Sequence, residues 1–306
     1  MINLQISPEL AADHVATRLY LNAALADSES LIVHGLPIEV YHNDRNSISK
    51  SGLDDVHQSA AHYFARHLAP DRPARETKGG QLEGSLAHCA TLEPDQFEKR
   101  YAVGPDINRN TKDWKAFEAG LPAGVVSIKH HQAATACAQA LEVYKLPEIA
   151  RAFSSGGPER SIYWIDKATG VRCRCRPDWL TAPMGPTDGV IALDVKTFRS
   201  ASPGAFQRQV AAKRYHVQAA FYVDGIQAAL GVEVLGFVFA VVEGTYPYLA
   251  NAMMLDDAAI DLGRREYRAD LERYAACKAS GVWSGYGDSV SVVSLPGWAF
   301  YAGDES

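Results

Sequence analysis

The chain has 306 residues, of which 47% are apolar and 22% are charged, so it is long enough to bury a sizeable core. This composition excludes a disordered chain, a collagen and a long coiled coil. The net charge of −6, from 30 basic and 36 acidic residues, excludes a wholly basic protein that coats nucleic acid. The five cysteines form no C-x-x-C pair, which argues against a disulfide framework and a zinc ribbon. Without a leader-like or membrane-spanning apolar run, we expect a cytoplasmic protein with no membrane contact.

The first 45 residues predict a helix followed by a short strand. Residues 7–25 open with Ser-Pro-Glu and carry apolar residues at helical spacing. The strand lies at either 31–33 or 38–41, and the pattern fits both positions. We therefore treat residues 1–45 as an N-terminal extension of a domain that spans residues 46–306.

The stretch from residue 47 to about 153 is mostly helical in pattern. Ser49 and Ser127 each precede an apolar run and are predicted helix caps. A further helix around residues 86–92 ends before Pro94, because the residue before a proline disfavours the helical conformation.

The pattern changes to strands after the Gly-Gly-Pro turn at residues 156–158. A helix follows over 203–229, a strand buried on both faces over 234–242, and a last helix from Asp256 as N-cap to Gly281 as C-cap. This order of elements predicts one α/β domain with a helical N-terminal part. The three strand-like segments before the first of these helices are 161–165, 171–180 and 190–197.

Two carboxylates in these strands are candidates for a metal site. Asp178 and Asp194 end or interrupt otherwise apolar or alternating strands, where an unpaired buried charge is costly. Asp194 and Lys196 are two residues apart on a strand and share a face, so the carboxylate can hold a metal while the ammonium reaches a phosphate or a water. Asp178 would complete an all-oxygen set suited to Mg²⁺. The alternative for an isolated D-x-K is a salt bridge between Asp194 and Lys196, with Asp178 capping a turn.

Positive charge is concentrated around these carboxylates. Residues 159–214 hold ten Lys/Arg and five Asp/Glu, a local charge of +5 that leaves −11 for the rest of the chain. Such a distribution is expected where a polyanion is brought to a metal site on an otherwise acidic body. The predicted DNA-binding cluster is Arg172, Arg174, Arg176, Arg199, Lys213 and Arg214.

A polar stripe lies in the helix that follows. Arg214, Gln218 and Tyr222 recur four residues apart and share one helical face. Beside a metal site, Gln218 could orient a water or a phosphate, and Tyr222 could hydrogen-bond or stack. Simple solvent exposure of this face is the alternative interpretation.

Five motifs in order give the chain a family resemblance over roughly residues 45–300. The sequence resembles the PD-(D/E)xK nucleases of the RecE (exodeoxyribonuclease VIII)-like and RecB-nuclease-like group. The resemblance implies an α/β restriction-endonuclease-like core, in which a mixed central sheet is flanked by helices. The motifs are G-x-x-x-H at Gly84–His88, L-E-P at Leu92–Pro94, R-P-D at Arg176–Asp178, D-V-K at Asp194–Lys196, and the helix Tyr215–Tyr222.

The same resemblance implies roles for individual residues and for a cofactor. The metal would be Mg²⁺, with Mn²⁺ as a substitute. The metal ligands would be His88, Asp178, Asp194 and the Val195 carbonyl, and the catalytic groups would be Lys196, Asp178, Asp194, Gln218 and Tyr222.

The implied activity is that of a Mg²⁺-dependent deoxyribonuclease that degrades double-stranded DNA ends 5′-to-3′ in recombination. The resemblance also implies a single-strand annealing protein as a partner and a homo-oligomer, a tetramer. A single-strand or structure-specific nuclease of the same fold is one alternative. A DNA-binding partner of an annealing protein, with a vestigial metal site, is the other.

The sequence departs from the family pattern in small ways. The second acid is Asp194 and not Glu, and a Pro/Gly-rich insertion at 183–186 lengthens the hairpin before it. Some relatives hold an iron–sulfur cluster on three C-terminal cysteines, and with Cys277 alone in that region we expect no cluster. Cys173 and Cys175 point to one face of a strand and are predicted to be buried as small apolar residues.

Overall fold

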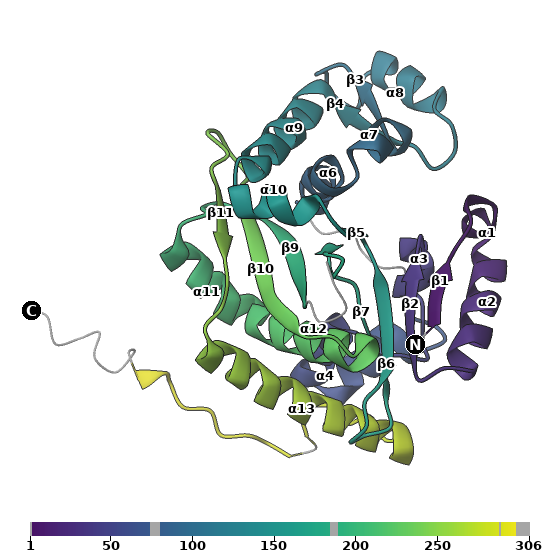
Figure 1. Cartoon of the computed structure of the whole chain (residues 1–306), viewed down its shortest axis with the longest axis vertical. Helices are drawn as coiled ribbons and strands as arrows, with labels where there is room; N and C mark the ends of the chain where they lie inside the picture. Colours follow the sequence, from purple (N-terminus) through teal and green to yellow (C-terminus); the bar gives the residue numbers. More distant parts are fainter. Residues whose placement is uncertain (1, 74–79, 184–188, 288, 298–306) are drawn as a thin grey trace, which may run out of the picture.

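A computed structural model describes residues 2–73, 80–183, 189–287 and 289–297 of the chain. Mixed sheets run through the molecule with helices on both sides, which confirms the predicted α/β class (Figure 1). The predicted turn at residues 183–186 lies largely outside the described residues. No helix in the described part of the chain is long and apolar enough to cross a membrane.

The central sheet has the strand order β11-β10-β9-β8-β5. β9 and β10 pair in parallel, and the other neighbours pair antiparallel. Both long strands consist mainly of Val, Leu, Ile, Ala and Phe because helices or further strands cover both their faces. The strand bounds are β5 Gly157–Pro158, β8 Trp179–Leu180, β9 Val190–Phe198, β10 Val234–Glu243 and β11 Ala250–Met253.

A second sheet continues from the first and includes the N-terminal strands. Its order is β1-β2-β6-β7, and the chain passes from β7 into β8 through residues 176–178. Residues 1–45 therefore share a sheet with the core, although the domain boundary at residue 45 stays a prediction. The bounds are β1 Ile2–Gln5, β2 Ser30–His34, β6 Ser161–Ile165 and β7 Arg172–Cys175; a separate pair consists of β3 Tyr101–Gly104 and β4 Val126–Lys129.

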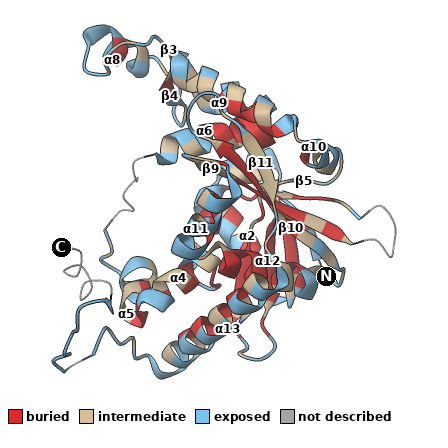
Figure 2. Ribbon diagram, turned by 90° about the vertical axis from the view of Figure 1, so that its left-hand side faces the viewer, coloured by how far each residue is buried: buried red, intermediate tan, exposed pale blue. Residues whose placement is uncertain are grey.

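Among the described helices, α12 has the most buried residues. It packs against β6, β7 and β10 on one side and α13 on the other, and α13 exposes its outer side (Figure 2). Cys173 and Cys175 lie fully buried in the same core, as predicted. The helices in this part are α4 Lys50–Gln58, α5 Ala60–Tyr63, the π-helix η1 Phe64–Leu68, α11 Pro203–Lys213, α12 Tyr215–Leu230 and α13 Asp257–Ser280.

A group of helices lies at one end of the central sheet, together with β3 and β4 (Figure 1). Within it α6 packs on α9 and also reaches β9, which brings one turn of α6 over the strands. The helices are α6 Gln81–Leu92, α7 Pro94–Arg100, α8 Lys112–Ala119, α9 His130–Tyr144 and α10 Pro147–Phe153.

Two predicted helices are each broken into two. The first is α1 Pro8–Ala12 and α2 His14–Ala26, because the Asp13 carboxylate accepts the Val15 and Ala16 N–H groups and starts a new helix. The helix predicted over 203–229 breaks at Arg214, whose φ of 53° is left-handed and whose guanidinium pairs with carboxylates on α4 and α13. Tertiary ion pairs thus override the helical pattern.

Other boundaries are confirmed or corrected as follows. Ser49 caps α4, and Asp256 and Gly281 cap α13, as predicted. Ser127 is not a helix cap, because it lies inside β4 and its hydroxyl donates to Glu118 instead. Of the two candidate N-terminal strands the first is correct, and the second is a helix, α3 Ile38–His42. The strand predicted over 171–180 divides into β7 and β8.

Candidate active site

Asp178 lies where the chain leaves β7 and enters β8. Its half-buried carboxylate accepts a hydrogen bond from the Val195 N–H, with Oδ2 2.7 Å from the nitrogen, which ties the connection to β9. The same oxygen lies 3.0 Å from Nε2 of His88. Asp178 therefore does not cap a turn, because its side chain is fixed between β9 and α6.

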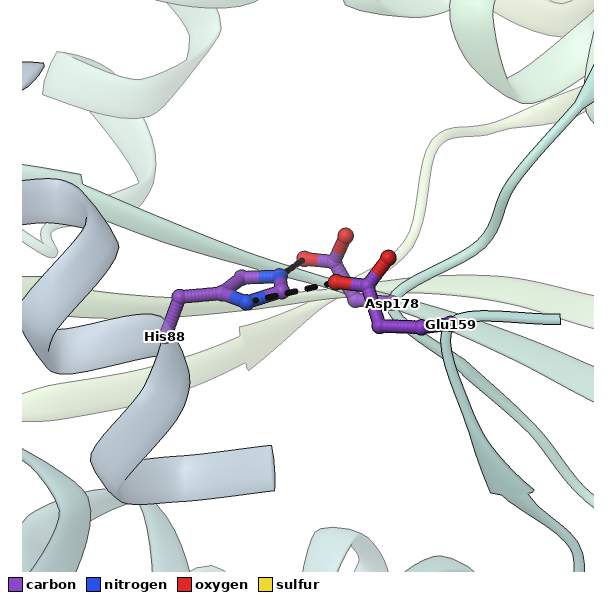
Figure 3. Close-up of side chains that lie close together, drawn as sticks. All are labelled: His88, Glu159 and Asp178. Atoms are coloured by element: carbon purple, nitrogen blue, oxygen red, sulfur yellow. Dashed lines mark ion pairs between the residues drawn. The ribbon is translucent and has the colours of Figure 1, made fainter. Parts of the chain in front are cut away.

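His88 is held between two carboxylates. Its Nε2 faces Asp178 and its Nδ1 lies 3.4 Å from Oε1 of Glu159 (Figure 3). The flanking residues Ala87 and Cys89 are buried, so the packed face of α6 sets the direction in which the imidazole points. One ligand atom from each of His88, Glu159 and Asp178 lies within 4.8 Å of the others, which is close enough for all three to hold one ion.

Glu159 is a site residue that the sequence motifs do not reveal. It follows the short strand β5, and its φ of 52° is in the left-handed region, which is rare for a non-glycine residue. Arg176 holds its Oε2 at 2.6 Å, and the Glu159 N–H donates to the Asp178 carbonyl at 3.1 Å. The available sequence signal is the Gly-Gly-Pro turn before it, which fixes the backbone but does not mark the carboxylate as functional.

Asp194 and Lys196 lie side by side on β9 and form an ion pair. Gln218 on α12 donates to Asp194 Oδ1 at 2.6 Å, so α12 fixes the carboxylate from the opposite side. The Lys196 ammonium also lies 5.0 Å from the centre of the Tyr215 ring. The salt bridge of the alternative interpretation is present, but it lies beside the group of His88 and Asp178.

The charges of the site are strongly coupled. Burial raises the pKa of Asp194 to about 6, against the effect of the Lys196 ammonium, and burial also raises the pKa of Glu159. Burial alone would lower the pKa of His88, but Asp178 and Glu159 outweigh it and raise that pKa to about 9. Burial is likewise outweighed at Asp178, where His88 and Lys196 hold the pKa below its usual range. The carboxylates thus lie in a site that stabilises added positive charge.

A comparison with known protein families shows which family this chain belongs to. A family model described as a PDDEXK-like domain of unknown function (DUF3799) matches residues 49–296. The chain belongs to this PDDEXK-like family.

The PDDEXK-like fold is also found in a solved structure. A crystal structure from Eubacterium rectale, described as "Putative exonuclease", superposes with a TM-score of 0.56 and 16% identity over 88% of this chain and 99% of that chain. At this identity the likeness shows the fold alone. No curated protein matches the chain in sequence.

Two of the predicted site residues, Val195 and Tyr222, make contacts in the structure that leave their predicted roles untested. Val195 offers its N–H to Asp178, and the proposed ligand role of its carbonyl stays a prediction. Tyr222 packs edge-on against Phe237, with ring centres 5.6 Å apart, and burial raises its pKa well above the usual value. Tyr222 therefore lies in the core beside Gln218, and its catalytic role stays a prediction.

Four members of the predicted DNA-binding cluster have partners inside the protein. Arg172 donates to the carbonyls of Leu25 and Ser28, and Arg174 is buried against Ser47 and Asp44. The same holds for Arg176, which pairs with Glu159 and the Leu36 carbonyl, and for Arg214, which pairs with Asp54, Glu266 and Asp270.

The six basic residues therefore do not form one exposed surface. Arg199 and Lys213 are exposed, and their contact with DNA stays a prediction. Part of the charge excess instead compensates carboxylates of the protein itself, as the pair of Arg176 and Glu159 shows.

Proposed function

We propose that this PDDEXK-like protein is a metal-dependent DNA exonuclease, which acts 5′-to-3′ on double-stranded ends in recombination. The observation that carries the proposal is the convergence of His88, Glu159 and Asp178 beside the pair of Asp194 and Lys196. Polarity and strand preference come from the sequence resemblance alone.

The donor set fits a divalent cation such as Mg²⁺ or Mn²⁺. Carboxylate oxygens suit both ions, and Mg²⁺ would keep several waters beside them. The imidazole of His88 favours Mn²⁺ over Mg²⁺, because Mg²⁺ prefers oxygen ligands. Burial raises the pKa of Asp194 and of Glu159, and the positive charge of a bound dication would favour the charged form of both carboxylates. When bound, such an ion activates a water and stabilises charge on the phosphate.

The protein groups around the ion would position the reactants. Asp178 is fixed by the Val195 N–H and Asp194 by Gln218, so neither carboxylate needs to reorganise on binding. Lys196 is tethered by Asp194, and its ammonium is placed to offset negative charge on the attacked phosphate. Arg176 holds the far oxygen of Glu159 and leaves Oε1 facing His88.

Digestion of end-labelled DNA tests the proposal. Linear duplex, circular duplex and single-stranded DNA are incubated with Mg²⁺ or with EDTA. We expect progressive loss of linear duplex from its 5′ ends with Mg²⁺, intact circles, and no reaction in EDTA. Cleavage of single strands or of branched substrates alone would favour the alternative nuclease activities. DNA binding without any hydrolysis would favour the vestigial DNA-binding module.

We also propose, from the resemblance alone, a tetramer and an annealing-protein partner. Light scattering on the purified protein tests the tetramer, and a monomeric mass at working concentration would refute it. Co-purification with a single-strand annealing protein expressed in the same cells tests the partner.

A further inference from the structure

A polar cavity of about 660 Å³ lies on the N-terminal side of the molecule, between α2, the loop that follows α3 and the end of the segment after η1. Figure 1 shows α2 and α3 beside β1 and β2, apart from α6, the helix that carries His88. A volume of this size is within the range of small-ligand sites. Its polar lining residues are Arg18, Asn22, Asn43, Asp44, Arg45, Asn46 and Arg72.

Two of the three arginines in this cavity have no side-chain partner among the residues that the structure describes. Arg18 and Arg45 are exposed, and neither makes an ion pair or a side-chain hydrogen bond within the described part of the chain. Arg72 donates to the His67 carbonyl and to Asn43 Oδ1, which fixes its guanidinium at the rim. The cavity therefore collects three guanidinium groups from three separate segments of the chain.

The carboxylate that lines the cavity does not neutralise these arginines. Asp44 turns inward, where its side chain is only 5% exposed, pairs with Arg174 and accepts the Ser47 hydroxyl. Its other oxygen accepts the Asn46 N–H at 2.8 Å. These hydrogen bonds of Asp44 hold the loop that carries Arg45, which is exposed and has no ion pair within the described ranges of the chain.

We propose that this cavity binds a phosphate group through Arg18, Arg45 and Arg72. Guanidinium forks and amide N–H groups match phosphate oxygens in charge and in geometry. Asn22 lies one helical turn from Arg18 on α2 and its Oδ1 holds the Asn46 amide, so both amides line the same wall. The phosphate belongs to the DNA backbone or to a free nucleotide, and the first source rests on the proposed nuclease function.

The cavity is largely outside the part of the chain that the family model matches. Arg18 and Arg45 precede residue 49, where that match begins, and Arg72 lies within it. The binding site would thus give the N-terminal extension a role that the family fold does not supply.

A charge-matched pair of variants tests the cavity. The test variant is Arg18→Ala/Arg45→Ala, which removes no internal bond of the described structure. The control is Arg265→Ala/Lys278→Ala, which removes two exposed charges from α13. Equal melting temperatures of both variants and the wild type establish that the fold is intact.

Two probes are measured in EDTA, so that no hydrolysis interferes. The first is a labelled blunt duplex of about 30 base pairs, whose anisotropy is followed between about 50 and 200 mM salt. The second is the mononucleotide dAMP, followed by calorimetry.

If the ligand is the DNA backbone, the test variant binds the duplex roughly 5- to 20-fold more weakly than the control, and its salt slope falls by about 1–2. If the ligand is a free nucleotide, dAMP binds the wild type and the control but not the test variant, and the duplex affinities of the two variants agree. The inference is overturned if both probes bind the test variant as they bind the control. A wild type that binds the duplex but cleaves nothing with Mg²⁺ would refute the nuclease and leave the cavity standing.

Discussion

Replacing Glu159 by glutamine tests the role of the one site residue that the sequence motifs do not include. The change keeps the size of the side chain and removes one negative charge next to His88. The Arg176 Nε–H also donates to the Glu159 carbonyl, a hydrogen bond that the change leaves in place, so the turn after β5 keeps its geometry. We expect Glu159→Gln to fold normally and to bind divalent metal more weakly.

The size of the effect follows from the geometry of the site. At the 3.4 Å that separates Glu159 Oε1 from His88 Nδ1, a unit charge pair is worth about 5 kcal/mol at an effective dielectric of 20. The two side chains are 22% and 26% exposed, so solvent reduces the net value to about 2 kcal/mol. Losing the charge weakens the binding of a dication more than it weakens the binding of the competing proton to His88. We therefore expect metal affinity to fall about 10- to 100-fold.

Calorimetric titration of Mn²⁺ into the protein without DNA measures this effect independently of activity. The matched control is Glu266→Gln, because Glu266 also pairs with one arginine and one histidine, Arg214 and His216. We expect wild-type Mn²⁺ affinity in the control. Equal affinities for Glu159→Gln and Glu266→Gln would show that Glu159 is not a metal ligand.

Three further predictions probe catalysis, pH dependence and packing. Lys196→Ala should leave Mn²⁺ affinity nearly unchanged and slow single-turnover hydrolysis by about 10²-fold or more, and loss of metal binding would return Lys196 to a purely structural role. At Asp166, burial would raise the pKa, but hydrogen bonds from Thr169 and Arg268 outweigh it and hold the pKa below its usual value. The stabilisation by this carboxylate is therefore present above about pH 4 and is lost as the pH falls further. Asp166→Asn should lower the free energy of unfolding, measured with denaturant, by about 1–3 kcal/mol at pH 7 and progressively less toward pH 3. A loss that does not change with pH would contradict this dependence. Gly225→Ala should destabilise the protein by about 1–3 kcal/mol, because the added Cβ would lie 2.3 Å from the Trp164 ring. This clash outweighs the better helix propensity of alanine. An unchanged melting temperature would show that the ring can move.

The sequence allows strand β9 of the candidate site to be predicted because its pattern is local. Asp194 and Lys196 must share a face at a spacing of two residues, and an apolar strand around them leaves few other structures. The order of motifs also places His88 and Gln218 at the same site, and the hydrogen bond from Gln218 to Asp194 shows one of these contacts directly.

Features that depend on distant partners could not be predicted in the same way. From the sequence, Arg174 is predicted to bind DNA, but in the folded protein its guanidinium contacts Asp44 and Ser47. The break at Arg214 depends on carboxylates of two other helices, and the site role of Glu159 depends on where α6 places His88. Counting charges along the chain cannot separate such internal pairs from a free basic surface.

The most direct test of the account is the position of the metal itself. Crystals soaked in Mn²⁺ and measured at the manganese absorption edge would show the ion as an anomalous difference peak. We predict a peak about 2.0–2.3 Å from ligand atoms of His88 and Asp178, with Glu159 or Asp194 completing the protein ligands. A fully soaked crystal with no peak at these residues, or with a peak at another cluster, would contradict the central claim that this group of side chains is a catalytic metal site.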